Sequence, residues 1–107
     1  MAAASGPFTT VHYDGVEPEV ITDGITVRRL WRSGERSAIV VDIAPGAVWP
    51  GDDVHAPGPE EVYVVSGVFN DGHADYPAGT FYHAPAGTSH VPQSTIGCQL
   101  FVFYPDG

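Results

Sequence analysis

Two histidine-bearing segments of the sequence have the composition of a divalent metal site. His55 stands in DVHAPGPEEVYVVSG, a Pro/Gly-rich loop that runs into the acid pair Glu60-Glu61 and then into a strand-like stretch. His90 stands in GTFYHAPAGTSHVP, on the far side of a strand–turn–strand unit. First-row divalent metals bind neutral imidazole nitrogens and carboxylate oxygens at about 2.0–2.2 Å. A metal held by such side chains would keep open positions for a substrate or for dioxygen.

The elements that must position these residues are strands, because strands distant in sequence can point alternate side chains into one barrel. The 13 Gly and 10 Pro residues among 107 are too many for a helical bundle, while 43% hydrophobic residues allow a buried core. No ten-residue segment shows a helical period free of Gly or Pro, and Asn70-Asp71-Gly72 is a typical hairpin turn. We expect an all-β domain of about seven to nine strands, the clearest at 25–32, 38–43, 61–66, 68–70, 80–84 and 99–104.

The chain is expected to form a single folded domain. Residues 1–24 contain closely spaced turn signals and predict an N-terminal arm with the first short strands, and residues 25–107 predict the barrel domain. Candidates for lining a substrate pocket are His83, Tyr63 and Phe81. A paired strand histidine is an equal alternative for His83. Cys98 is expected to be a buried small hydrophobe, since no His or Lys flanks it to activate the thiol.

Charge and cysteine content exclude several classes of partner. Four basic against thirteen acidic residues give a net charge of −9, which would repel the phosphates of nucleic acid and of anionic membranes. No window approaches the roughly 18 apolar residues that span a bilayer, and MAAASGPFTT lacks the basic and apolar regions of a secretory signal. The single cysteine permits no internal disulfide, which fits a reducing compartment. We therefore expect a cytoplasmic protein with a small-molecule substrate or ligand.

At the two histidine segments the sequence resembles the cupin signature. The second cupin motif, G-x(5)-P-x-G-x(2)-H-x(3)-N, reads here as Gly79, Pro85, Gly87 and His90, with Ser94 at the final Asn position. The first motif, G-x(5)-H-x-H-x(3,4)-E-x(6)-G, is kept in part. Its second His, its Glu and its last Gly correspond to His55, Glu60 and Gly67, its first His to Asp53, and its first Gly to Ala47. If His55 instead corresponds to the first His, Pro57 takes the place of the second.

The stretch EEVYVVSGVFND…ADYPAGTFYHAPAGTSHVPQSTIGCQLFVFY is similar to the cupin-like domain of ChrR-type anti-sigma factors and to acetylacetone-cleaving cupins. The resemblance covers roughly residues 25–105. It implies a single-domain double-stranded β-helix, or jelly-roll, barrel. It also implies metal ligands at His55, Glu60 and His90, with Asp53 in place of the missing imidazole. Glu61 remains the alternative to Glu60.

The resemblance implies three possible functions. The first is an oxygenase in which iron(II), with Zn, Mn or Ni as alternatives, binds a small diketone or ketone as an enolate before oxygen cleaves a C–C bond. The second is a non-catalytic module that binds and senses a metal or small ligand. The third is a metal-dependent isomerase or lyase, because one fold serves many chemistries. The resemblance also implies a homodimer.

Overall fold

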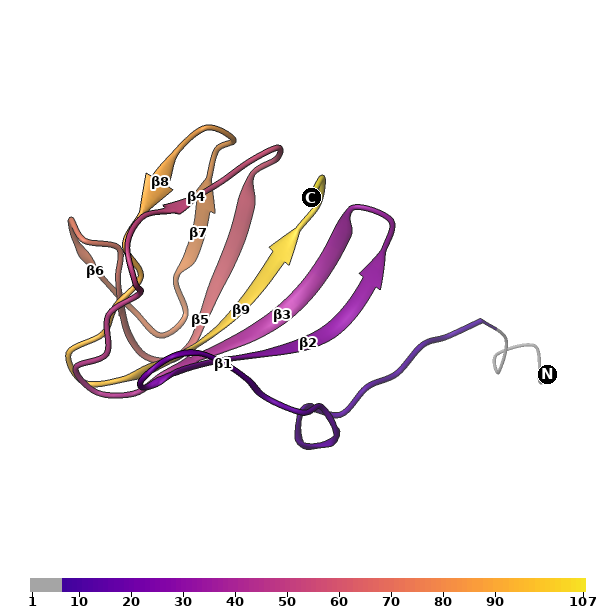
Figure 1. Ribbon diagram of the computed structural model, residues 1–107, viewed down its shortest axis with the longest axis horizontal. Helices are drawn as coiled ribbons and strands as arrows, with labels where there is room; N and C mark the ends of the chain where they lie inside the picture. The colour runs from indigo at the N-terminus through magenta and orange to yellow at the C-terminus, as the bar shows by residue number, and fades with distance from the viewer. Residues whose placement is uncertain (1–6) are drawn as a thin grey trace.

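The computed structural model describes residues 7–107, which form nine β-strands and one turn of 3-10 helix, η2 (Tyr13–Gly15) (Figure 1). The first six residues of the predicted arm lie outside the described residues. The strands are β1 (Glu19–Thr22), β2 (Ile25–Ser33), β3 (Arg36–Ile43), β4 (Asp53–Val54), β5 (Glu60–Asn70), β6 (Asp75–Pro77), β7 (Phe81–Ala84), β8 (Ser89–His90) and β9 (Cys98–Tyr104).

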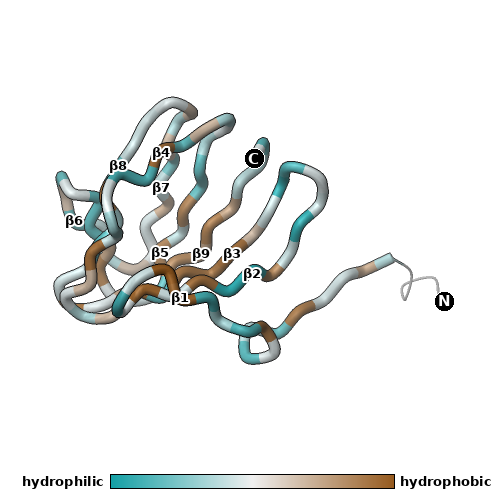
Figure 2. The backbone as a smooth tube through the Cα atoms, viewed as in Figure 1, coloured by the Kyte–Doolittle hydropathy of each residue, from teal (hydrophilic) through white to brown (hydrophobic). Residues whose placement is uncertain are grey.

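Seven of the strands form one strongly curved antiparallel sheet with the order β1-β2-β3-β9-β5-β6, and β7 also pairs with β5. Alternate residues along its central strands face the concave side, where their apolar side chains pack together. In Figure 2 the apolar stretches of β2, β3, β9 and β5 lie side by side along this wall. The core residues are Ile25, Val27, Ile39, Val41, Ile43, Val62, Val64, Phe69, Cys98, Leu100 and Val102.

Strand β5 changes partner half-way along its eleven residues. Residues 60–63 pair with β7, whereas residues 68–70 pair with β6. Gly67 lies between the two halves with φ +74°, and a Cβ atom there would approach the carbonyl oxygen of Gly97 to 2.0 Å. Only glycine fits this close approach to the neighbouring chain without strain. The bend lets the start of β5 and the turn after it both reach the concave side.

Strands β4 and β8 form a separate two-stranded sheet that faces the large one (Figure 1). Asp53 pairs with His90 and Val54 with Ser89 in this short ladder. The all-β prediction is confirmed. Among residues 7–107, however, no ladder joins β4 to β1–β3, so the sheets do not close into a complete barrel.

The longer strands coincide with the predicted ones, except that 61–66 and 68–70 belong to the single strand β5. Strand β1 lies within residues 1–24, where short strands were expected without bounds, and the strands that were not predicted, β4, β6 and β8, have two or three residues each. So few residues cannot display a two-residue hydrophobic alternation. No helix in the described part of the chain is long and apolar enough to cross a membrane.

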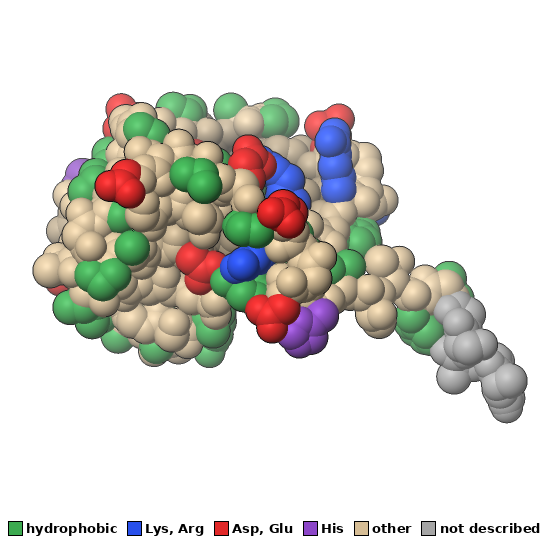
Figure 3. Space-filling model, turned by 60° about the horizontal axis from the view of Figure 1, so that its bottom comes forward, with side chains coloured by type: hydrophobic (Ala, Val, Ile, Leu, Met, Phe, Trp, Pro, Cys, Tyr) green, Lys and Arg blue, Asp and Glu red, His purple; other side chains and the backbone are tan. Residues whose placement is uncertain are grey.

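The segment before β1 packs on the convex face of the large sheet. The Tyr13 hydroxyl donates a hydrogen bond to Asp42, and the Arg28 guanidinium lies 4.0 Å from the centre of the Tyr13 ring. Arg28 pairs with Val40 across β2 and β3, and this cover explains why Val40 is buried although it points away from the concave side. On the face shown in Figure 3, acidic side chains are scattered, and the few basic side chains lie among them without forming a continuous basic patch.

Candidate metal centre

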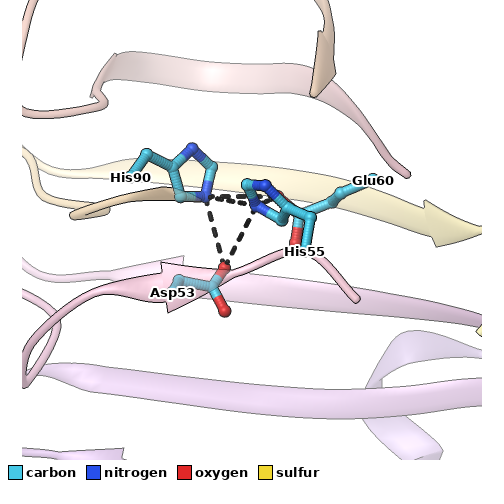
Figure 4. A group of neighbouring side chains, drawn as sticks. All are labelled: Asp53, His55, Glu60 and His90. Atoms are coloured by element: carbon cyan, nitrogen blue, oxygen red, sulfur yellow. Dashed lines mark hydrogen bonds and ion pairs between the residues drawn. The ribbon is translucent and has the colours of Figure 1, made fainter. Parts of the chain in front are cut away.

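Four side chains, from β4, the residue after it, β5 and β8, converge inside the open barrel (Figure 4). Asp53 and His90 are brought together because they are paired residues of the β4–β8 ladder. His55 follows β4 directly, and its backbone N–H and C=O bond to Thr88 and Gly87 in the loop before β8. Glu60 begins β5 and faces the concave side. The structure thus brings together all four residues that the cupin resemblance implied.

The facing atoms of the four side chains lie within 4.8 Å of one another. The Nε2 atoms of His55 and His90 are 3.1 Å apart. Glu60 Oε1 lies 3.4 Å from the first and 3.3 Å from the second, and Asp53 Oδ2 lies 3.7 Å and 3.2 Å from them. Adjacent ligand atoms around an ion at about 2.1 Å are separated by about 3.0 Å in an octahedron and about 3.4 Å in a tetrahedron. The chain's own spacing therefore fits a first-row divalent ion.

Burial makes this arrangement unfavourable unless a positive charge lies within it. The side chains of His55, Glu60 and His90 are at most 5% exposed, and no Arg or Lys of the described residues is in the cluster. In the unprotonated cluster, the lone pairs of two neutral imidazoles face each other between two negatively charged carboxylates. Burying these carboxylates without a positive charge beside them is costly. Either a metal ion or a proton can supply the missing charge.

His90 shows the second possibility in the metal-free cluster. Burial alone would lower the pKa of His90, because it disfavours the charged imidazolium. Hydrogen bonds and the negative charges of Asp53 and Glu60 outweigh burial and raise that pKa to about 9. Metal binding must therefore displace a proton from His90 at neutral pH.

A hydroxyl fixes the tautomer of His55. Thr88 Oγ1 lies 3.0 Å from His55 Nδ1, and the Thr88 hydroxyl donates its own hydrogen to the carbonyl of Pro85 at 2.6 Å. The Thr88 oxygen is therefore the acceptor and His55 Nδ1–H the donor. This bond leaves the His55 Nε2 lone pair directed into the cluster, as a metal ligand requires.

A second hydroxyl orients Glu60. Tyr104, the last residue of β9, donates a hydrogen bond of 2.8 Å to Glu60 Oε2, so that Oε1 faces the histidines. Burial and the nearby carboxylates raise the pKa of Tyr104 above its usual value, which keeps its hydroxyl protonated as a donor. Asp53 differs, since its side chain is 26% exposed and its hydrogen bond runs to His90 within the cluster.

A cavity of about 310 Å³ opens beside the cluster, in the gap between β1–β3 and β4. Asp53 and His55 lie on its wall, together with mainly apolar residues and the charged Arg29. A smaller cavity of about 30 Å³ reaches Glu60 and shares Ile39, Trp49, Asp53 and Tyr104 with the larger one. The cluster is therefore accessible to a small molecule from one side.

Comparison with known proteins identifies the family to which the chain belongs. The family model for the ChrR cupin-like domain matches residues 8–105, nearly all of the described chain. The chain belongs to the ChrR cupin-like domain family. No curated protein matches it.

Solved structures agree on the cupin fold. The anti-sigma factor ChrR from Rhodobacter sphaeroides, in complex with SigE, matches with a TM-score of 0.72 and 24% identity, over 87% of this chain and 51% of that one. The chain thus spans about half the length of ChrR. An RmlC-like cupin from Shewanella frigidimarina gives a TM-score of 0.80 and 21% identity, over 94% and 93%. An acetylacetone dioxygenase from Acinetobacter johnsonii gives 0.77 and 15%, over 92% and 72%.

The cupin fold explains which of the adjacent acids belongs to the cluster. Side chains alternate along β5, so Glu60 points inward and Glu61 points outward. Glu61 Oε2 lies 2.8 Å from Nδ1 of His83, on the outer face of β5 and β7. The alternative of Glu61 as a ligand is therefore wrong in this cupin, as is His83 as a cavity residue. The other reading of His83, a paired strand histidine, is confirmed.

Tyr63 and Phe81 also lie on the outer face of the cupin. They pair across β5 and β7 and are 46% and 64% exposed. The prediction that they line the pocket is wrong, because both share the outward parity of Glu61. Pocket walls come instead from residues on β1–β3, the loop after β3 and β9, including Ile39, Trp49 and Tyr104.

Sequence reasoning missed the residues that hydrogen-bond to the candidate ligands: Thr88 to His55, Tyr104 to Glu60, Tyr82 to His90 and, through Tyr82, Asp71. Thr88 carried a usable signal, because it lies two residues before His90 inside the second cupin motif. Tyr104 carried none, since its contact with Glu60 spans 44 positions. Asp71 was assigned only to a hairpin turn, which is also correct, as its carboxylate caps that turn.

Proposed function

We propose that this cupin is a metal-dependent oxidoreductase of the dioxygenase type, acting on a small carbonyl or diketone compound with iron(II) as the favoured metal. The observation that supports the proposal is a buried set of two imidazoles and two carboxylates at ligand spacing, open on one side to a cavity. Two histidines and a carboxylate with open positions form the ligand set of many non-haem iron oxygenases.

Each residue has a distinct part in the proposed activity. His55, His90 and Glu60 bind the ion from the buried side, and Asp53 binds it from the cavity side. When bound, the ion supplies Lewis acidity toward a carbonyl oxygen and, as iron(II), the electrons for dioxygen chemistry. Ile39 and Trp49 form apolar walls that exclude water and orient the carbon skeleton of the substrate.

The size and polarity of the cavity favour a small and mainly apolar substrate. A volume of about 310 Å³ is at the lower end of ligand pockets, roughly 300–1,000 Å³. The basic residue on the wall of this cavity is Arg29, and its Nε forms an ion pair with Glu19 Oε2 at 3.1 Å. A single neutralised guanidinium is a poor site for a phosphosugar, which disfavours sugar-phosphate isomerases.

Metal analysis and oxygen uptake test this function. We expect about one ion per chain in the purified protein, and oxygen consumption when ferrous protein is mixed with acetylacetone. His55→Ala and His90→Ala should lose both properties. His83→Ala is the matched control, because His83 is paired with a glutamate on the outer face and should keep both. Metal retained by both inner variants would remove the site.

A second function, a non-catalytic module that binds a metal or small ligand, is supported by the family match to the ChrR cupin-like domain. It predicts the same metal stoichiometry and the same loss in the two inner variants. Tight metal binding without oxygen uptake or turnover across a panel of small ketones and diketones would favour this module over the enzyme.

The single cysteine, a buried free thiol, supports the expected cytoplasmic location.

The outer face of the sheet supports a homodimer as the assembly. Phe81, Tyr63 and Phe101 pair in a continuous row across β7, β5 and β9, and all three are more than a third exposed. Exposed apolar rows of this kind mark interaction surfaces. Light scattering should give twice the monomer mass, and Phe81→Ser together with Phe101→Ser should return it to 11.3 kDa. A monomeric wild-type protein would contradict the dimer.

A further inference from the structure

Asp71 is a buried carboxylate that lies outside the metal cluster but is linked to it. It follows β5 directly and is 5% exposed. Its Oδ1 accepts hydrogen bonds from the backbone N–H groups of His73 and Ala74, each 2.9 Å long. Its Oδ2 accepts from the hydroxyls of Tyr82 at 2.9 Å and Tyr76 at 3.3 Å. Four donors and no acceptor require an ionised carboxylate.

The environment of Asp71 agrees with that charge state. Burial acts to raise the pKa of Asp71, but the hydrogen bonds from the turn and from both tyrosines outweigh burial and hold the pKa below its usual value. Asp71 is therefore an acceptor only. The tyrosine hydroxyls that touch it must direct their hydrogens toward it.

Tyr82, on β7, lies between Asp71 and a proposed metal ligand. Its hydroxyl oxygen is 2.9 Å from Asp71 Oδ2 and 3.2 Å from His90 Nδ1. A tyrosine hydroxyl has a single hydrogen, and here the hydrogen goes to the carboxylate. His90 Nδ1 must then donate its own hydrogen to the Tyr82 oxygen. Once metal binding displaces the proton from Nε2, the Nε2 lone pair of His90 is directed at His55, Glu60 and Asp53.

We infer that Tyr82 and Asp71 form one positioning unit that holds His90 with a proton on Nδ1, so that Nε2 is available as a metal ligand. The inference rests on the proposed metal site. It concerns how one proposed ligand, His90, is held through the hydrogen-bonded series Asp71–Tyr82–His90, which crosses from the β5–β6 turn through β7 to β8. Groups that fix the second nitrogen of a ligating histidine raise metal affinity by about 10- to 100-fold.

Packing lets the hydrogen bond be tested without disturbing the ring. The His90 ring lies 5.7 Å from the Tyr82 ring and 5.8 Å from the ring of Phe69, which is fully buried. A Tyr82→Phe change removes the hydroxyl and keeps these aromatic contacts. It also leaves the two backbone bonds to Asp71 Oδ1, which hold the β5–β6 turn.

Tyr76 provides the matched control. Its hydroxyl bonds to the same Asp71 oxygen, and its ring packs 5.1 Å from Tyr82, but the bond of His90 Nδ1 runs to Tyr82 alone of the two tyrosines. Tyr76→Phe thus removes a hydroxyl that bonds to Asp71 in the same way but makes no hydrogen bond to His90. A merely structural role of the tyrosine cluster would make the two variants alike.

The experiment compares wild type, Tyr82→Phe, Tyr76→Phe and Asp71→Asn by competition for Zn²⁺ with a chromophoric chelator. The ring N–H signals of His90 are recorded in ¹⁵N-edited spectra of metal-free and zinc-loaded protein. We expect Tyr82→Phe to bind zinc about tenfold more weakly and Tyr76→Phe less than threefold more weakly. The His90 Nδ1–H signal should be slowly exchanging in wild type and Tyr76→Phe, and shifted or lost in Tyr82→Phe.

Asp71→Asn sharpens the test because it changes a residue that does not touch His90. The asparagine oxygen can still accept the backbone bonds of the turn, whereas its NH₂ would donate to the Tyr82 oxygen. That reversal frees the Tyr82 hydrogen for His90 Nδ1 and moves the imidazole proton toward Nε2. We expect a loss of zinc affinity at least as large as in Tyr82→Phe. In metal-free protein above about pH 9, where the His90 ring is neutral, its proton should be redistributed between the two nitrogens.

Two results would overturn the positioning unit. One is an unchanged His90 Nδ1–H signal in Tyr82→Phe with zinc affinity within twofold of wild type. The other is equal losses in Tyr82→Phe and Tyr76→Phe. Failure of the metal site looks different, because wild type itself would then bind no zinc. The Nδ1–H signal of the metal-free proteins would still decide the hydrogen bond, since loss in Tyr82→Phe alone supports the unit.

Discussion

Two neighbouring glutamates of β5 each meet a histidine, one on either face of the sheet. Outside, Glu61 lies 2.8 Å from His83, and both side chains are more than a quarter exposed. Inside, Glu60 lies 3.3–3.4 Å from His90 and His55, with side chains at most 5% exposed. The outer pair is the shorter contact, yet only the inner group converges with further ligands.

The difference teaches that the surroundings, and not the contact between acid and histidine, make a group of side chains a candidate metal site. Water can solvate the outer pair, so its net contribution is small. The inner group has three ligands fixed from behind by hydroxyls of Thr88, Tyr82 and Tyr104. It is therefore held in one geometry and needs a positive charge at its centre.

The sharpest way to break this comparison is to neutralise each glutamate in turn. Glu60→Gln removes a buried ligand charge, and we expect zinc or iron(II) affinity to fall by more than about 100-fold. Glu61→Gln should change affinity by less than about twofold, because exposed charges contribute little. Chelator competition measures both. Equal losses in the two variants would show that the inner face is not the metal site.

Asp53 is the inner ligand that most resembles the outer pair, and its removal should have a smaller effect. Its side chain is 26% exposed and lies on the cavity wall, and its hydrogen bond runs to His90. We expect Asp53→Asn to lower metal affinity by about 30-fold, less than Glu60→Gln, since only its charge is lost. Asp53→His, which installs the residue of the full cupin motif, should recover affinity. A loss in Asp53→Asn larger than in Glu60→Gln would reverse the assignment of the stronger ligand.

Tyr104→Phe tests whether fixing a ligand from behind matters apart from the ligand itself. The change removes the 2.8 Å bond to Glu60 Oε2 and keeps the ring that lines both cavities. We expect metal affinity to fall by about tenfold and the free energy of unfolding of the metal-free protein by about 1 kcal/mol. Titration with zinc and chemical denaturation measure the two effects. Tyr63→Phe, on the outer face, is the control and should leave both unchanged.

The sequence allowed prediction of the fold class, the longer strands and all four cluster residues, because these depend on hydrophobic alternation and on motif spacing. It did not separate Glu60 from Glu61, since a shift of one residue exchanges the faces of a strand and the loop before β5 hides its start. Tyr63 lies two residues after Glu61 and Phe81 pairs with Tyr63, so both lie on the outer face of the sheet together with Glu61. Residues behind the ligands were missed because their contacts, such as Glu60 with Tyr104, arise only when distant strands pair.

The last expected effect concerns protons in the metal-free protein. The pKa of His90 is raised to about 9, against desolvation, by Asp53 and Glu60. Because the folded-state pKa exceeds the ordinary value, its stabilising effect is complete below about pH 6.5 and is lost as pH rises through about 9. We expect the free energy of unfolding of chelator-treated protein to decrease over this window, by on the order of 2 kcal/mol.

Titrating the His90 ring by NMR links this pH effect to the comparison of the two faces. Glu60→Gln removes one of the charges that hold the proton, so the pKa of His90 should fall by about one pH unit or more. Glu61→Gln removes a charge of the same sign from the adjacent residue, but on the far side of the sheet and beside His83. Glu61→Gln should therefore leave the pKa of His90 unchanged. If both variants moved it equally, the overall charge of −9 would govern the cluster, and the inner geometry would not.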